Sequence, residues 1–440
     1  IDYDGKAYAY PIMGIVGGGI VYNKKVFKKA GIEEYDMEII STRKGRGSTI
    51  ITTTDGMRIL EPFRGSMVRL EQEYVLKQLL RERGCENLDH IIPNREGQLF
   101  TCDRYRQPHV LKKHFEGEEC DMSVMEDLRR TIGALSKFHL EGMWAAKEFE
   151  ERWIETRRLK EERRVEEIRQ ALEDGEELER VAYLYEISQS ALEKAVKQEK
   201  MYTDSHSDAH GALSAFDGET SIENVKTMFV RHNAQINKIR KFVSKVKRRN
   251  RFENLFLEVC QGFYKQGLYC VEMLKDENVS LDTRNEARPE SQQRCSGVSD
   301  DALIRHFGIC HGSFNQHNVI LGENDVAIVH FERFSRGNQL NDLYQFCRKA
   351  MEKNHFDYGL LMQLFDEYGK LIPLTGMDYQ YMYVMFSYPE KFWKIANGYY
   401  NSNKAFLSPK YLEKLETVIC QEKEKQEMLD SMKNIVFERI

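Results

Sequence analysis

Residues 310–334 read CHGSFNQHNVILGENDVAIVHFERF, and this stretch decides the fold that the sequence predicts. An apolar approach leads into a polar loop from His311 to Asn318, and a short VIL strand follows it. A Gly-Glu-Asn-Asp turn then leads into a second strand, VAIVHFE. The pattern predicts a strand-loop-strand unit that presents polar side chains on one loop and on the strand after it.

Phosphoryl transfer is a chemistry that suits such a unit. It needs a carboxylate that accepts the acceptor hydroxyl's proton, and an Asn and an Asp that hold Mg²⁺. A Lys and a glycine-rich turn steady the phosphates. The loop must present the base and the Asn a few residues apart, and the metal-binding Asp must come from the following strand. The arrangement within 310–334 matches this design.

The segment resembles the H-G-D-x-x-x-x-N loop and the following I-D-F-D/E strand of the aminoglycoside phosphotransferase and choline kinase superfamily. It is more similar still to the spore-coat kinase-like proteins of the CotS type. RKGRGS at 43–48, EGEEC at 116–120 and YPEKFWKIANGYYNSNKAF at 388–406 resemble that branch. The resemblance covers Tyr35 to about Lys425. It implies an α+β, two-lobed, protein-kinase-like fold with a small β-rich N-lobe and a large helical C-lobe.

Residue by residue, the resemblance places the family's catalytic loop on this sequence with two departures. His311 matches the loop His, and Asn318 matches the metal-binding Asn. Ser313 falls where the family has its catalytic Asp, and a neutral hydroxyl is no equivalent base. Losing positioned proton transfer alone costs roughly 10²–10⁴ in rate. His330 falls where the family has its metal-binding Asp, and neutral imidazole is a poor ligand for Mg²⁺.

The expected phosphate-binding groups also depart from the family. Glu61 falls near the strand position where kinases keep a phosphate-binding Lys, and a negative charge there would repel ATP. Gly45, Gly47 and Ser48 could cradle phosphate through backbone N–H groups. A two-glycine turn is equally a tight hairpin, so both interpretations stay open.

Glu332 is a possible replacement for the metal-binding Asp that the sequence lacks at position 330. Side chains alternate along a strand, so Glu332 should share a face with His330 and could supply a substitute carboxylate. Asn318 with Glu332 is then a candidate pair for one weakly bound Mg²⁺. The sequence therefore predicts that no cofactor is required, with weak binding of ATP and Mg²⁺ as the alternative.

Other clusters of chemically active residues have simpler interpretations. Cys310, His311, His317 and His330 suggest a zinc site, but adjacent residues cannot easily ligate together. Asp342 is expected to cap a helix, and in the wider family an Asp here supports the catalytic loop.

Basic and aromatic runs need no ligand to explain them. Residues 231–251 carry many basic side chains and are expected to form a solvated face of a helix that continues to about 273. The aromatic run at 388–406 is expected to be helical core packing.

The chain divides into three expected parts. Residues 1–34 form an appended segment that resembles part of a sugar-binding protein of ABC importers. Residues 35–118 form the N-lobe and 119–440 the helical C-lobe. The C-lobe carries a charged helical insert at about 145–225 and flexible loops at 203–221 and 276–300.

Composition limits the class of partner. The net charge is −5, from 65 basic and 70 acidic residues, and this balance argues against a nucleic-acid binder. No run approaches the roughly 18 apolar residues that a membrane span needs. The nine cysteines contain no C-x-x-C pair, which indicates reduced, intracellular thiols.

These observations predict a kinase-fold protein with little or no catalysis. The resemblance implies a coat component that contacts other spore-coat proteins, first in the mother-cell cytoplasm and then in the coat. The alternative is a weakly active ATP-dependent phosphotransferase that acts on a hydroxyl of a small molecule.

Overall fold

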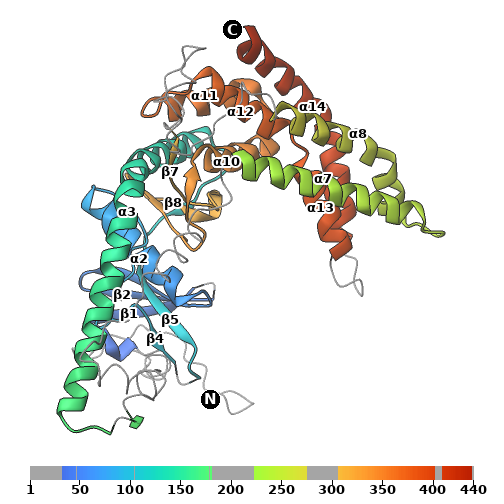
Figure 1. Ribbon diagram of the computed structural model, residues 1–440. Helices are drawn as coiled ribbons and strands as arrows, with labels where there is room; N and C mark the ends of the chain where they lie inside the picture. The colour runs from blue at the N-terminus through green and yellow to red at the C-terminus, as the bar shows by residue number, and fades with distance from the viewer. Residues whose placement is uncertain are drawn as a thin grey trace, which may run out of the picture.

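A small sheet-rich lobe and a larger helical lobe make up the chain in the computed structural model (Figure 1). The structure describes residues 32–45, 47–103, 105–177, 179–180, 222–274, 306–401 and 409–438. The loops predicted at 203–221 and 276–300 lie outside the described residues, as does almost all of the segment predicted at 1–34. The expected order of an N-terminal sheet lobe before a helical lobe is confirmed.

Five antiparallel strands form the sheet of the first lobe in the order β1-β2-β3-β5-β4. The Ile- and Thr-rich segments that follow Tyr35 form its first three strands. The segment HIIPN at 90–94 adds no strand to this sheet, since Ile91 makes only an isolated bridge to Lys112. The strands are β1 (Ile39–Lys44), β2 (Thr49–Thr53), β3 (Gly56–Pro62), β4 (Thr101–Cys102) and β5 (Pro108–Lys113).

One helix, α2 (Met67–Glu82), packs against the sheet lobe and against the long helix α3 (Met125–Glu173). α3 has 49 residues and runs from the helical lobe alongside the sheet lobe (Figure 1). The sequence predicts a largely solvated charged helix here, but α3 buries Phe149 and Trp153 in the main core. Arg152 also pairs with Glu82 of α2 at 3.0 Å. The helix therefore ties the two lobes together.

Two small sheets at the centre carry the segment 310–334. The second predicted strand is shorter than expected, because it ends at Ile328 and His330 adopts a left-handed φ of 67°. A β-strand cannot pass through such a residue. The strands are β6 (Glu118–Glu119), β7 (Phe307–Cys310), β8 (Val319–Leu321), β9 (Val326–Ile328) and β10 (Ser335–Asn338).

Helices make up the remainder of the second lobe, as the sequence predicts for the region after Asn341. None of the described helices is long and apolar enough to cross a membrane. They are α7 (Ile222–Ser244), α8 (Arg251–Met273), α10 (Leu340–Lys353), α11 (Tyr358–Gly369), α12 (Gly376–Ser387), α13 (Glu390–Asn401) and α14 (Lys410–Glu438).

The basic segment 231–251 is not one continuous helix. α7 ends at Ser244, and Asn250 starts α8 with a capping box in which it and Glu253 bond reciprocally. The two helices form a hairpin that packs on α13 and α14. Phe392 and Tyr399 of the aromatic run are buried there, which confirms the predicted core role.

Candidate functional site

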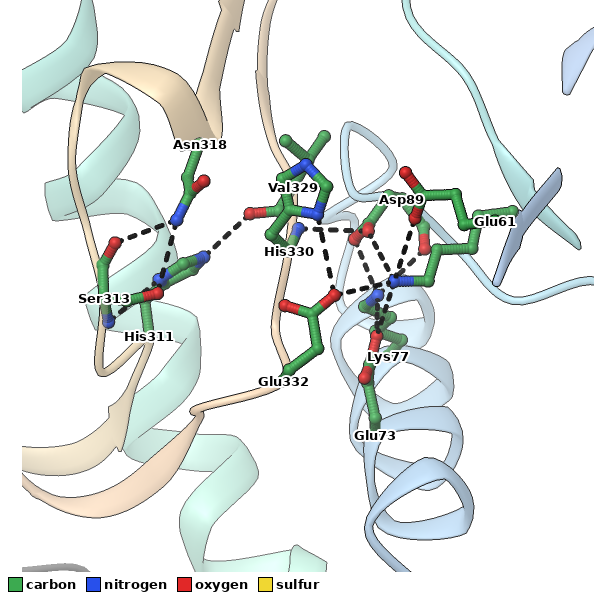
Figure 2. Close-up of polar contacts among 11 residues, drawn as sticks. Glu61, Glu73, Lys77, Asp89, His311, Ser313, Asn318, Val329, His330 and Glu332 are labelled. Atoms are coloured by element: carbon green, nitrogen blue, oxygen red, sulfur yellow. Dashed lines mark hydrogen bonds and ion pairs between the residues drawn. The ribbon is translucent and has the colours of Figure 1, made fainter. Parts of the chain in front are cut away.

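The loop between β7 and β8 positions three of the predicted residues close together (Figure 2). The Asn318 side-chain nitrogen donates to the Ser313 carbonyl at 2.9 Å and to the Ser313 hydroxyl at 3.3 Å. His311 is fully buried and its Nε2 lies 2.9 Å from the Val329 carbonyl. The Ser313 backbone N–H donates to His311 Nδ1 at 3.3 Å. His311 therefore carries its proton on Nε2 and acts as a neutral bridge across the loop.

The Asp342 side chain anchors this loop through hydrogen bonds to its backbone. Its carboxylate accepts the backbone N–H groups of His311 at 2.5 Å and Gly312 at 3.0 Å. It is fully buried in the first turn of α10, whose N-cap is Gln339. The predicted helix-capping role of Asp342 is therefore wrong. The side chain supports the loop, as the family resemblance implied.

His330 and Glu332 lie on the irregular segment after β9. His330 Nδ1 is 3.6 Å from Glu332 Oε1, so the two side chains do meet. Strand alternation is not the cause, because β9 has already ended and the left-handed turn at His330 brings them together. The contact with Glu332 raises the pKa of His330 despite the opposing effect of burial. It likewise helps to lower the pKa of Glu332, which burial alone would raise.

A buried lysine, Lys112 of β5, was not foreseen from the sequence. Its ammonium lies 3.2 Å from Glu332, 3.4 Å from Asp89, 3.6 Å from Glu73 and 3.8 Å from Glu61. The carboxylates come from four separate segments, and Figure 2 shows them converging on one point. One local signal was available. Lys112 lies two residues after the buried Val110, so both side chains share one face of β5, and a buried lysine needs charged partners.

A second buried lysine completes the cluster. Lys77 of α2 lies 2.5 Å from Glu73, one turn away, and 2.6 Å from Asp89. Two ammonium groups thus face four carboxylates. Burial would lower the pKa of Lys112, but Glu73, Asp89 and the other two carboxylates raise it well above its ordinary value. Lys112 is therefore charged at neutral pH.

Glu61 lies at the edge of this cluster rather than alone at a phosphate site. It stands opposite Val110 in the β3–β5 ladder, so Lys112 is its diagonal neighbour on the same face. The acid on β3 and the lysine on β5 form a charge pair at 3.8 Å. The predicted repulsion of phosphate by Glu61 is therefore partly offset by the positive charge of the adjacent Lys112.

The glycine turn of RKGRGS is a tight hairpin between β1 and β2. Gly45 N–H donates to the Ser48 carbonyl at 2.9 Å, and Gly47 has a φ of 80° that favours glycine. These contacts satisfy the hairpin interpretation. A phosphate-binding role for Gly45, Gly47 and Ser48 remains a prediction.

The residues present do not fit a magnesium ion. Glu332 offers a carboxylate, but the same oxygen contacts both Lys112 and His330. Asn318 is bonded to Ser313 through its amide nitrogen, which leaves one neutral oxygen. Over the described parts of the chain, no three His, Cys, Asp or Glu side chains gather in a geometry for a metal. This also gives the zinc interpretation of Cys310, His311, His317 and His330 no support.

The overall fold was compared with known proteins. No protein-family model and no curated protein sequence matches the chain. An aminoglycoside phosphotransferase from Alicyclobacillus acidocaldarius superposes with a TM-score of 0.64 at 12% identity, over 93% of this chain and 96% of that one. The chain has the fold of an aminoglycoside phosphotransferase.

Further solved structures are similar to this fold at lower scores. A spectinomycin phosphotransferase solved with ADP and spectinomycin matches with a TM-score of 0.48 at 10% identity, over 91% and 97% of the two chains. An amicoumacin kinase solved with AMP-PNP and Ca²⁺ matches with 0.43 at 9%, over 93% and 92%. At 12% identity, the match to the Alicyclobacillus protein shows the fold alone, so the site is judged from its own residues.

Proposed function

We propose that this protein is a CotS-like spore-coat component that keeps a kinase fold without transferring phosphate. It would act through contacts with other coat proteins, first in the mother-cell cytoplasm and then in the coat. The sequence resemblance supports the coat role, and the chemistry of the site supports the lack of catalysis. The expected absence of nucleic-acid and membrane partners follows from the composition.

The observation that carries this proposal is Ser313. The resemblance places it where a carboxylate should accept the proton of the acceptor hydroxyl. Its hydroxyl instead accepts a hydrogen bond from the Asn318 amide at 3.3 Å. A neutral serine hydroxyl is too weak a base to accept that proton near pH 7. His311 cannot activate it, because both imidazole nitrogens already make hydrogen bonds.

The second half of the site points the same way. His330 replaces an oxygen ligand with an imidazole, and Mg²⁺ prefers oxygen. Glu332, a nearby carboxylate that could substitute, contacts the Lys112 ammonium instead. The groups expected for the base and for the metal are thus both replaced, at Ser313 and at His330.

The test measures phosphate transfer and nucleotide binding in the purified protein. We expect no ATP turnover above the buffer rate and no shift of the melting temperature that requires ATP and Mg²⁺ together. Turnover at an ordinary enzymatic rate, of about 1 per second or more, would overturn the proposal. Fluorescent tagging in a sporulating host tests the coat role separately, and a signal that never reaches the forespore surface would contradict it.

A weakly active phosphotransferase is the alternative, and one observation favours it. Asn318 is intact, and the carboxylate of Glu332 lies on the segment from which a metal ligand would come. Under this alternative, Asn318→Ala abolishes a slow, Mg²⁺-dependent transfer to a small hydroxyl compound. Ser313→Asp combined with His330→Asp should then raise the rate, whereas the leading proposal expects a gain only if the remaining site still admits nucleotide.

A further inference from the structure

The hairpin of α7 and α8 carries a dense run of positive charge. Residues 238–251 hold eight basic side chains and no acidic one. The net charge of the whole chain is −5, so the rest of the chain carries a net charge of −13. The hairpin is therefore opposite in sign to the remainder of the chain.

Some of these cations already have partners. Arg251 pairs with Glu416 of α14 at 2.7 Å, and Arg249 donates to the carbonyls of Val243 and Ser244 at 3.1 and 2.8 Å. Four further cations around the turn are exposed and make no ion pair with any residue that the structure describes. This group, the basic tip, consists of Lys241, Lys245, Lys247 and Arg248.

An exposed aromatic side chain lies within the basic tip. Phe242 of α7 follows Lys241 and is 51% exposed, although its ring also meets that of Tyr400 at 5.9 Å between centroids. Protein interfaces favour aromatic contact area, and charges that a partner of opposite sign neutralises give them specificity. The end of the hairpin lies at the outer edge of the helical lobe, away from β8 and the sheet lobe (Figure 1). It is therefore open to a second molecule.

A surface of opposite charge lies where the two lobes join. The segment EGEECDMSVMED at 116–127 holds six acidic residues and no basic one. Within it β6 pairs with β8, with Glu118 opposite Leu321, so the turn after β8 adjoins this segment. The exposed acids of the β6 segment and of that turn form the acidic strap, which consists of Glu116, Glu118, Glu119, Asp121, Glu323 and Asp325.

Four of the six acids in the strap are available to a partner. Glu119 pairs with His317 at 2.5 Å, and Asp121 bonds within its own turn. The other four make no ion pair within the described ranges of the chain. Arg130 lies nearby, but it donates to two backbone carbonyls that flank the turn after β8. Val124, which is 43% exposed, adds apolar area next to the acids.

We propose that the basic tip of one copy of this protein docks on the acidic strap of a second copy. Four exposed cations then face four exposed carboxylates. A molecule does not satisfy its own strap, because the tip lies away from β8, the strand with which the strap pairs (Figure 1). Since tip and strap are different surfaces, each copy offers one of each to its neighbours, and the contact extends from copy to copy. The inference goes beyond the proposed function, because it concerns surfaces that take no part in phosphate chemistry.

A second copy fits the basic tip better than a nucleic acid or an anionic membrane does. Both of those partners are extended polyanions, and they would repel the remainder of the chain, whose net charge is −13. The acidic strap instead presents negative charge on one small surface, which matches the small extent of the tip. Complementary charge of this kind selects a partner and fixes its orientation.

The first test compares the oligomeric state of the full chain at low and at high salt. In analytical ultracentrifugation at about 20 mM NaCl, the mean mass should rise above that of the monomer as the protein concentration increases. At about 0.5 M NaCl it should return to that of the monomer, because salt screens exposed charges. A wild type that stays monomeric at every concentration in low salt overturns the proposal, including the case in which it binds DNA or anionic vesicles instead.

Charge reversal then identifies the two surfaces. The tip variant carries Lys241→Glu, Lys245→Glu and Lys247→Glu, and the strap variant carries Glu118→Lys, Glu323→Lys and Asp325→Lys. Each variant alone should associate at least about tenfold more weakly than the wild type, since like charges then meet at the contact. An equimolar mixture should recover association, because each tip in it finds a strap of opposite sign. Two weakened variants that do not recover on mixing overturn the proposal.

The matched control reverses three exposed cations elsewhere, on α3: Lys147→Glu, Arg163→Glu and Arg169→Glu. It changes the net charge as much as the tip variant does but leaves both surfaces intact, so its association should stay close to that of the wild type. A loss equal to that of the tip variant overturns the proposal, since net charge would then explain it. If a triple variant does not fold, Lys245→Glu and Glu323→Lys replace the pair in the same mixing test.

Discussion

The ammonium of Lys112 lies 3.2 Å from Oε1 of Glu332, and this contact joins β5 of one lobe to the loop after β9 of the other. The two partners differ in their surroundings. The Lys112 side chain is 5% exposed, whereas that of Glu332 is 48% exposed. The interaction is therefore buried at one end and open to water at the other.

The first prediction contrasts Glu332 with Asp89, which is 4% exposed. Asp89→Asn should cost about 3–5 kcal/mol, because it removes one of the two almost fully buried carboxylates, Glu73 and Asp89, that face the buried ammonium groups. Glu332→Gln should cost about 1 kcal/mol or less, since water screens the carboxylate. Urea denaturation measures both. Equal losses would show that the charge cluster does not depend on burial.

The second prediction concerns the support of the polar loop. Asp342→Asn removes a buried charge that accepts two backbone N–H groups, and we expect a loss of about 2–4 kcal/mol. Asp357→Asn is the matched control. Asp357 is an exposed N-cap of α11, where Asn caps as well as Asp, so the change should be under about 0.5 kcal/mol. Comparable losses in both variants would argue against a loop-supporting role for Asp342.

A third prediction separates backbone strain from steric clash at two glycines. Gly312 has φ 76°, and a Cβ there would lie 2.0 Å from the Arg333 carbonyl oxygen. Gly84 has φ 86° but nothing within 4 Å of its added Cβ. Gly84→Ala should therefore cost about 1–2 kcal/mol from the left-handed backbone alone. Gly312→Ala should cost clearly more, measured by thermal denaturation, and an equal cost would show that the loop can move away freely.

The fourth prediction is a pH dependence at His232. This side chain is buried and stacks on Trp393, with 3.3 Å between the ring centroids. Burial, together with Arg231, lowers its pKa to about 4. Below about pH 6.5 the unfolded chain takes up a proton that the folded chain rejects, so stability falls as the pH decreases from about 6.5 to about 4.

His232→Phe keeps an aromatic ring on Trp393 and removes this titration. The variant should lose less stability than the wild type between pH 6.5 and 4, by at most about 3 kcal/mol for one proton. Any cost of the larger ring should be the same at every pH. Denaturant midpoints at pH 7.5, 6, 5 and 4 test this, and parallel curves for the two proteins would contradict the prediction.

The local pattern of the sequence was sufficient for much of the sheet lobe. The Ile/Thr-rich segments between Tyr35 and Pro62 are strands, and the periodic segment from Met67 is a helix, because alternation and 3.6-residue periodicity depend on near neighbours only. The order of loop and strand at 310–334 was also readable. It brought Ser313 and Asn318 together as predicted.

Other features depended on partners distant in the sequence. Nothing near His330 signals its left-handed backbone, which ends the predicted strand early. The basic stretch after Arg231 gave no sign that the helix would break before Asn250. The charged part of α3 is largely exposed or half-buried after Trp153, as its thin apolar stripe predicted, but nothing local indicated that Trp153 would be completely buried in the main core.

The sequence by itself predicted the class of fold and placed a hydroxyl at Ser313 and an imidazole at His330, since both follow from residue identity and order. Only the tertiary structure placed Lys112 between Asp89 and Glu332, which lies 220 residues along the chain. The physical reason is that a buried ammonium tolerates removal from water only where carboxylates converge on it. Because the four carboxylates come from separate segments that meet only when the lobes pack, no local sequence pattern predicts this cluster.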